Sequence, residues 1–202
     1  AGNVEAIPTV DTLTADLQDG SADWPNWRGA HFDGKSKVNH MDIDWSDGLN
    51  KLWQIEYLCQ GTNTASWASP VVKGKNLIVP GRDETHDLVF CINTEDGSLI
   101  WTNSYEAKTQ TNHGPGARAT PFIDSLYVYT FGRNGDLVCW QLEDGKKVWH
   151  SNVNDFGGKE PDWGHSSTPL VYKNMVLVQG GGDALMLAFD KFNGNLIWKS
   201  MT

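Results

Sequence analysis

The chain has 202 residues, 39% of them hydrophobic, and a formal net charge of −9 at pH 7. That is enough length and apolar content to bury a sizeable core. The acidic balance argues against nucleic acid or an anionic membrane surface as the main partner. No apolar run in the sequence approaches the ~20 residues that a transmembrane helix needs.

Residues 1–44 are expected to form an N-terminal extension. Residues 1–22 are polar and rich in Thr and Asp, which favours a surface tail, and the one stretch with some helical periodicity is 10–18. Residues 23–44 lack any recognised metal-ligand spacing, so we interpret them as a polar, irregular stretch that packs Trp24 and Trp27 against a sheet. The alternative is a metal site built from His31, Asp33, His40, Asp42 and Asp44.

Tryptophan returns at a nearly constant interval in the rest of the chain. Successive positions are 48, 48 and 49 residues apart, beginning at Trp53. Each of the last three closes an eleven-residue segment that starts with a small residue and has Gly four places before the Trp. A fixed period in this range is typical of solenoids, propellers and arrays, because one unit cannot bury its apolar face alone. The repeat positions are Gly97, Trp101, Gly145, Trp149, Gly194 and Trp198.

Each repeat divides into four short strands. In the second copy, alternating apolar and polar residues predict strands at 120–124, 126–131, 136–142 and 146–152. The turn Glu143-Asp-Gly145 between the last two is a strong hairpin signal. Four antiparallel strands per repeat form one propeller blade. The predicted fold is therefore an all-β propeller with three complete blades at 66–105, 116–153 and 164–201.

Residues 45–57 look like the outer strand of a further blade. The gap from Gly48 to Trp53 is five residues rather than four, so we expect a bulge or a longer turn. Propellers have ~4–8 blades, and three blades with one strand cannot close a ring. We therefore expect further repeats of the same chain beyond residue 202. The alternative is an assembly in which several chains close the ring together.

The repeated segment resembles the tryptophan-docking motif, A-x-D-x-x-T-G-x-x-x-W, of the pyrroloquinoline-quinone (PQQ) type β-propellers. The resemblance covers roughly residues 45–202, and Asp23-Trp-Pro-Asn-Trp-Arg-Gly29 is similar to the W-P-x-W-R-G signature of bacterial PQQ-like repeat proteins. It implies a seven- or eight-bladed ring in which an N-terminal strand completes the last blade. It also implies a periplasmic or secreted bacterial protein.

Cysteine content does not settle the compartment. Cys91 and Cys139 occupy the same repeat position in neighbouring blades, where equivalent Cα atoms should lie beyond the ~7 Å limit for a disulfide. We expect both to be small buried residues and Cys59 to be free.

The candidate ligand-binding residues lie in loops. In a propeller, the loops that enter each blade, here 63–67, 113–118 and 163–167, gather at one mouth with the loops between second and third strands, 82–86, 132–135 and 180–183. The alternative interpretation is that these residues form turns and cap carbonyl groups. The candidates are Trp67, Arg82, Asp83, His86, His113, Arg118, Arg133, Trp163, His165 and Asp183.

The sequence favours a non-catalytic propeller outside the cytoplasm that acts as a binding or scaffolding module for a protein or a small ligand at the mouth. No catalytic residue, metal site or cofactor is predicted. One alternative is the N-terminal part of a PQQ-dependent dehydrogenase, which the resemblance implies would use PQQ with calcium. This chain lacks the adjacent cysteines of the alcohol-oxidising branch. A second alternative is a carbohydrate-binding propeller, suggested by the aromatic residues near the mouth.

Overall fold

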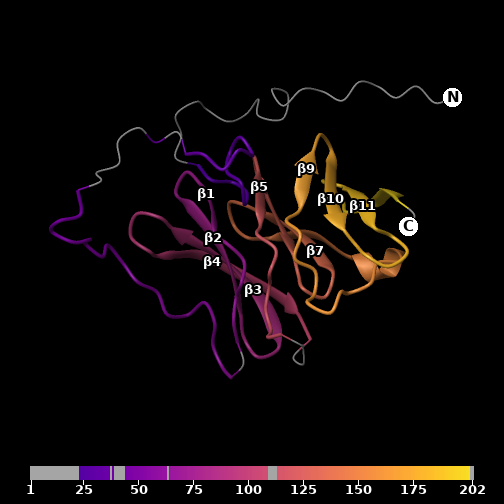
Figure 1. Ribbon diagram of the computed structural model, residues 1–202, viewed down its shortest axis with the longest axis horizontal. Coiled ribbons are helices and arrows are strands. Elements are labelled where there is room, and N and C mark those ends of the chain that lie inside the picture. Colours follow the sequence, from indigo (N-terminus) through magenta and orange to yellow (C-terminus); the bar gives the residue numbers. More distant parts are fainter. Residues whose placement is uncertain (1–22, 37, 39–43, 63, 109–112, 201–202) are drawn as a thin grey trace.

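The computed structural model describes residues 23–36, 38, 44–62, 64–108 and 113–200 (Figure 1). The predictions for residues 1–22, including the helical stretch at 10–18, lie outside the described residues. His40 and Asp42 of the alternative metal site do so too.

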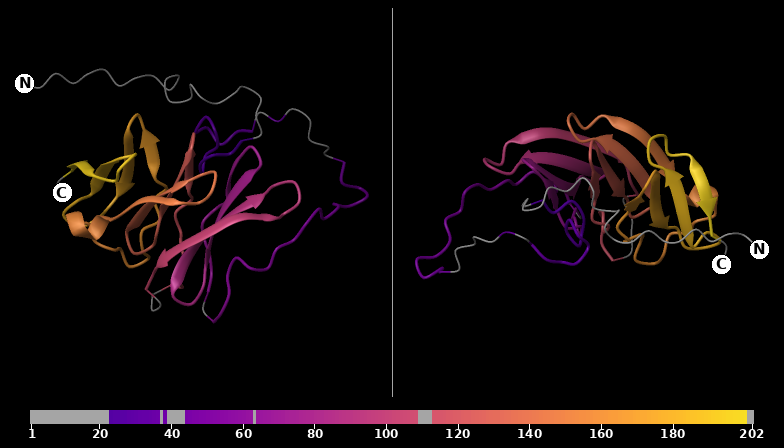
Figure 2. Two further views of the ribbon diagram at one scale, coloured as in Figure 1. Left: turned by 180° about the vertical axis from the view of Figure 1, so that it is seen from behind. Right: turned by 90° about the horizontal axis from the view of Figure 1, so that it is seen from above.

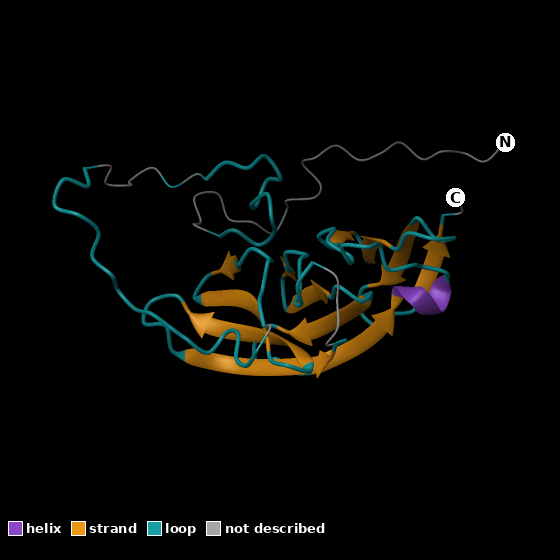
Figure 3. Ribbon diagram, turned by 60° about the horizontal axis from the view of Figure 1, so that its bottom comes forward, coloured by secondary structure: helices purple, strands orange, loops and turns teal. Residues whose placement is uncertain are grey.

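The described residues form three four-stranded antiparallel sheets. The first consists of β1 (Val71–Lys73), β2 (Asn76–Arg82), β3 (His86–Asn93) and β4 (Leu99–Glu106). The second consists of β5 (Phe122–Asp124), β6 (Tyr127–Phe131), β7 (Asp136–Gln141) and β8 (Lys147–Asn152). The third consists of β9 (Leu170–Tyr172), β10 (Met175–Gln179), β11 (Met186–Asp190) and β12 (Leu196–Lys199). A short 3-10 helix, η2 (Val153–Phe156), follows β8 (Figure 3).

The sheets are arranged as successive blades of a propeller. Within each sheet the strands are neighbours in chain order, and the innermost strands contact one another, β1 with β5 and β5 with β9. Viewed from above, the three sheets stand side by side along an arc (Figure 2). The prediction of an all-β fold with three four-stranded blades is confirmed, and we refer to the sheets as blades 1, 2 and 3.

The core lies between the blades, and the middle blade supplies both halves of it. In β6, Val128 packs into the cluster shared with blade 1, whereas its neighbour Tyr129 packs into the cluster shared with blade 3. In β7, Val138 and Leu137 divide in the same way. Successive side chains of a strand point to opposite faces, so the alternation in the sequence builds two interfaces at once.

The repeated tryptophans join one blade to the next. The indole nitrogen of Trp101 donates to the Leu142 carbonyl at 2.9 Å, and that of Trp149 donates to the Lys191 carbonyl at 2.9 Å. The ring of Trp101 presses against Gly145, where an added Cβ would lie 2.4 Å from the indole. Gly145 also has a φ of 72°, which L side chains rarely adopt.

Small residues sit directly behind the docked tryptophans. Cys91 pairs in register with Trp101, and Cys139 pairs with Trp149, each beside a β-bulge. Both cysteines are fully buried, and all three cysteines are free thiols. The prediction that Cys91 and Cys139 are small buried residues is therefore confirmed.

Residues 45–57 differ from the expected outer strand. Trp53 occupies the docking position, since its indole nitrogen donates to the Thr94 carbonyl at 3.0 Å and its ring presses against Gly97. The segment nevertheless contains no strand; it passes the free side of blade 1 (Figure 1). A strand needs a partner strand that accepts and donates its backbone hydrogen bonds. Among the described residues, no strand pairs with residues 45–57.

The N-terminal segment lies across the innermost strands. Trp24 exchanges two backbone hydrogen bonds with Val72, at 2.9 and 3.0 Å, and Ile123 of β5 donates to the Pro25 carbonyl at 2.8 Å. Trp24 therefore lies against blade 1 through its backbone, whereas the Trp27 side chain is 54% exposed. These backbone hydrogen bonds hold the segment on the innermost strands.

Within the part of the chain that the structure covers, we find no helix with the length and apolar character needed to cross a membrane.

Candidate functional site

The loops expected to form the mouth contact one another. The backbone nitrogen of Trp67 donates to the Ala117 carbonyl at 3.0 Å, which joins the loops that enter blades 1 and 2. The backbone nitrogen of His165 donates to the Arg133 carbonyl at 2.9 Å, which joins the loop that enters blade 3 to the β6–β7 loop. We call this set of loops the mouth.

Two exposed tryptophans contact the 113–118 loop. Trp67 donates from its indole nitrogen to the Pro115 carbonyl at 3.2 Å. The Trp163 ring stacks on His113 with centroids 3.5 Å apart and planes 12° from parallel. Trp67 is 59% exposed and Trp163 60% exposed. Both rings therefore have fixed orientations while keeping most of their surface in water.

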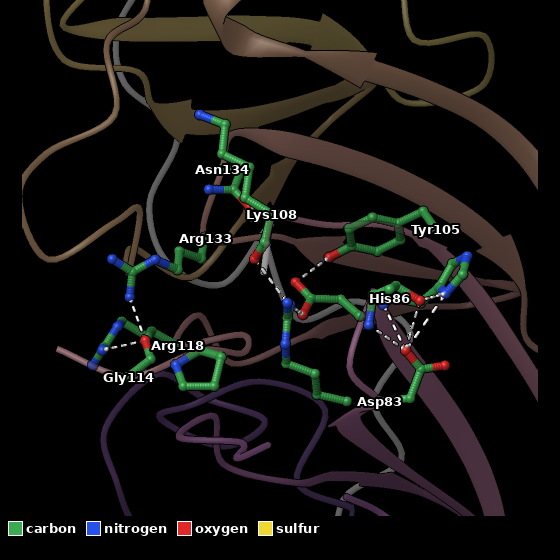
Figure 4. Close-up of polar contacts among 12 residues, drawn as sticks. Asp83, His86, Tyr105, Lys108, Gly114, Arg118, Arg133 and Asn134 are labelled. Atoms are coloured by element: carbon green, nitrogen blue, oxygen red, sulfur yellow. Dashed lines mark hydrogen bonds and ion pairs between the residues drawn. The ribbon is translucent and has the colours of Figure 1, made fainter. Parts of the chain in front are cut away.

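Arg118 and Arg133 converge on one carbonyl group (Figure 4). Arg133 donates to the Gly114 oxygen at 2.6 Å, and Arg118 donates to the same oxygen at 3.4 Å. Arg118 also donates to the His113 carbonyl and lies over the Trp67 ring, 5.7 Å from its centroid. Burial, and the nearby positive charge of Arg118, lower the pKa of Arg133. The loop thus gathers positive charge around its backbone.

Arg82 forms a buried ion pair at the end of β2. Its guanidinium donates to Asp87 at 2.6 Å and to the Lys108 carbonyl at 2.7 Å. Arg82 and Asp87 are each 2% exposed, and Tyr105 donates to the second Asp87 oxygen at 3.4 Å. Burial raises the pKa of the Asp87 carboxyl, partly offset by its bond to Arg82. Such a pair fixes geometry more than it adds stability.

Glu160, in the loop between blades 2 and 3, contacts side chains from two other loops of the mouth. It forms ion pairs with Lys108 at 3.2 Å and with Arg133 at 3.7 Å, and it accepts a hydrogen bond from Asn134 at 3.0 Å. Sequence reasoning missed Glu160, Asp87 and Lys108. The signal for Asp87 was available, because Arg82 and Asp87 flank one tight turn and pair in register across it.

His165 lies beneath the loops. It is 3% exposed, and its ring stands 5.0 Å from that of Phe131. Burial lowers its pKa, although the Gln179 backbone and the carboxylates of Glu160 and Asp136 oppose that shift.

The other candidates serve turns. The Asp83 carboxylate accepts from the backbone nitrogens of Thr85 and His86 at 2.7 Å each, which closes the β2–β3 turn. His86 contacts Thr85 through its ring nitrogen at 2.8 Å. Asp183 donates from its backbone nitrogen to the Gly157 carbonyl at 2.9 Å. These three fit the alternative interpretation of turn and cap residues.

Several buried polar atoms at the mouth have no hydrogen-bond partner among the described residues. Native structures contain few such atoms. They are Ser66 Oγ, Ser167 Oγ, Arg82 Nε, Arg118 Nε and His165 Nε2.

The described residues do not supply a metal centre. Among them, no group of three or more His, Cys, Asp or Glu side chains is placed to hold an ion. The carboxylates at the mouth, Asp87 and Glu160, are instead paired with arginine and lysine.

Comparison with known proteins places the chain in a family. The family profile described as outer membrane protein assembly factor BamB matches residues 85–202, more than half of the chain. The outer membrane protein assembly factor BamB of Moranella endobia is 23% identical over 159 residues, which cover 77% of this chain and 37% of that protein. The quinohemoprotein alcohol dehydrogenase of Comamonas testosteroni is 23% identical over 172 residues, covering 81% and 22%. The chain thus spans well under half the length of these relatives.

Solved structures agree on the fold. The quinohemoprotein alcohol dehydrogenase from Comamonas testosteroni superposes with a TM-score of 0.68 at 21% identity, over 95% of this chain and 29% of that one. A quinohemoprotein alcohol dehydrogenase from Pseudomonas putida gives 0.52 at 18% identity, over 71% and 21%. With the repeated docking tryptophans and the family match, the conclusion is that this chain belongs to the BamB family of PQQ-type repeat β-propellers.

Proposed function

We propose that this chain is a non-catalytic binding module of an extracytoplasmic β-propeller, and that the mouth is its binding surface. The observation that carries the proposal is the pair of exposed indoles, Trp67 and Trp163, which both contact one loop. Exposed aromatic side chains that are already fixed lose little entropy on binding, which is why they dominate recognition surfaces. A relative named as an outer membrane assembly factor supports the location outside the cytoplasm.

The carboxylates argue for binding rather than catalysis. A general base must be able to reach a substrate proton. Asp87 is buried against Arg82, and Glu160 is shared by Lys108, Arg133 and Asn134. Both are committed to holding the loops.

A thermal-melting screen tests the proposal. A ligand that binds only the folded chain raises its melting temperature. We expect at least one class among peptides, polysaccharides and small anions to stabilise the native chain but not the Trp67→Ala/Trp163→Ala double variant. Trp27→Ala is the matched control, because Trp27 is equally exposed but outside the mouth. A screen in which no class distinguishes native protein from double variant would refute the mouth as a binding surface.

The dehydrogenase alternative has its own test, motivated by the similarity to the Comamonas testosteroni enzyme. The chain is mixed with saturating PQQ and calcium and assayed for alcohol and glucose oxidation with an artificial electron acceptor. We expect neither a melting shift nor turnover. Turnover would refute the non-catalytic proposal and support the dehydrogenase alternative.

A further inference from the structure

The two exposed indoles contact the same loop, and we call the pair the platform. Trp67 contacts this loop through Pro115, and Trp163 contacts it through His113. An added Cβ on Gly114 would lie 3.6 Å from the Trp67 ring, so this indole also lies close to Gly114. A single sugar ring stacks on one indole, whereas an extended chain of rings offers a ring to each.

The platform is apolar, and polar side chains lie beside it. Indole faces bind flat, C–H-bearing surfaces. His113, which is exposed, stacks on the Trp163 ring, and Arg118, which is partly exposed, lies over the Trp67 ring. Pyranose rings combine an apolar face with a rim of hydroxyl groups that both donate and accept, so they match this pattern.

Arg118 carries a positive charge at the same loop, and among the described residues its guanidinium donates to the His113 and Gly114 carbonyls rather than to a carboxylate. The buried Arg82 and Arg133 are instead paired with Asp87 and Glu160. The whole chain, by contrast, carries a net charge of −9. Arg118 lies over the Trp67 ring, which places a guanidinium beside the surface on which a sugar would stack. Guanidinium groups suit carboxylate and sulfate oxygens.

We propose that the mouth binds an acidic polysaccharide, with Trp67 and Trp163 stacking on its sugar rings and Arg118 pairing with its acid groups. This inference rests on the proposed binding function and names the ligand class. The acid group is a carboxylate or a sulfate ester, since both present oxygens to a guanidinium in the same way.

Paired ligands that differ only in charge test the proposal. Polygalacturonate is compared with its fully methyl-esterified form, and dextran sulfate with neutral dextran, by titration calorimetry against the 202-residue chain. At about 0.1 M salt we expect one acidic ligand or both to bind at least tenfold more tightly than the neutral partner. The gap should shrink at high salt because screening weakens charge pairing. The acidic ligand that binds identifies the acid group.

Variants separate the platform from the charge. Trp67→Ala and Trp163→Ala should each weaken binding at least tenfold, with partial recovery in Trp67→Tyr and Trp163→Tyr. Arg118→Gln should remove most of the preference for the acidic ligand, and Trp27→Ala should leave affinity unchanged. Melting temperatures close to that of the native chain would confirm that the variants fold.

Three outcomes overturn the inference. Equal affinity for acidic and neutral ligands would rule out the acid group, and native-like binding by both Trp→Ala variants would rule out the platform. Absence of polysaccharide binding would also refute it. If a peptide then stabilises the native chain but not the double variant, the binding function stands and only the ligand class is wrong. If no compound class does so, both proposals fail.

Discussion

Trp149 and Trp198 occupy the same repeat position but have different surroundings. Trp149 is 7% exposed and presses against Gly194 of blade 3, whereas Trp198 is 39% exposed and its neighbour Ile197 50% exposed. Both pair in register with a small buried residue of their own sheet, Cys139 and Ala188. The sheet therefore positions the indole, but the following blade buries it. Stability in such an array is approximately a sum of the intrinsic stability of each repeat and the interface energies between neighbours.

Removing each indole measures that difference directly. We expect Trp149→Ala to lower the unfolding free energy of the 202-residue chain by about 3–5 kcal/mol, as for other buried aromatic truncations. Trp198→Ala should cost less than about 1 kcal/mol, since its ring has no blade to dock against in the described structure. Urea denaturation measures both. Equal losses would contradict the view that the neighbouring blade supplies the energy, and a chain with a further blade after residue 202 should bring the two values together.

The second prediction concerns Gly145, the glycine that the Trp101 ring covers. Gly145→Ala places a Cβ against the Trp101 ring and forces a side chain into a φ of 72°, so we expect a loss of about 2–4 kcal/mol. Gly74→Ala is the matched control, because Gly74 has a φ of 56° but nothing within 4 Å of the added Cβ. That variant should cost only the backbone strain, about 1 kcal/mol. Similar costs for the two variants would mean that crowding by the indole contributes nothing.

A buried histidine at the mouth, His165, predicts how the melting temperature of the chain depends on pH. Burial lowers the pKa of His165, so the folded state binds fewer protons than the unfolded state as pH falls below the usual histidine pKa of about 6.5. Stability from this group is present at neutral pH and is lost toward acid pH. The drop in melting temperature between pH 7 and pH 5 should be smaller for His165→Gln than for the native chain. A drop in His165→Gln as large as that of the native chain would contradict this assignment.

The repeat could be predicted from the sequence because each blade uses the same local rules. Alternation within β6 and β7 specified both faces, and the spacing of Gly145 and Trp149 specified the turn and the docking residue. The prediction of a strand at 45–57 was wrong because a strand needs a partner strand, and a local sequence pattern does not show whether one is present. Glu160 was missed for a similar reason, since it lies in a non-periodic loop and acquires its role only where two blades bring Lys108 and Arg133 together.

The two buried thiols, Cys91 and Cys139, report separately on the two interfaces between blades. Their reactivity is the smallest of the expected effects. Burial raises the pKa of Cys91 and of Cys139 to about 12, so at pH 8 only roughly one thiol in 10⁴ is ionised, and the thiolate is the reactive form. Cys59 is only partly buried. We expect a chromogenic disulfide reagent to label one thiol per folded chain, at Cys59, and none in Cys59→Ser, while denaturant exposes the remaining two in either protein. Labelling of Cys139 but not Cys91 in the folded chain would show that the interface between blades 2 and 3 opens independently of the interface between blades 1 and 2. Equal protection is expected, because the two tryptophans cover their cysteines in the same register.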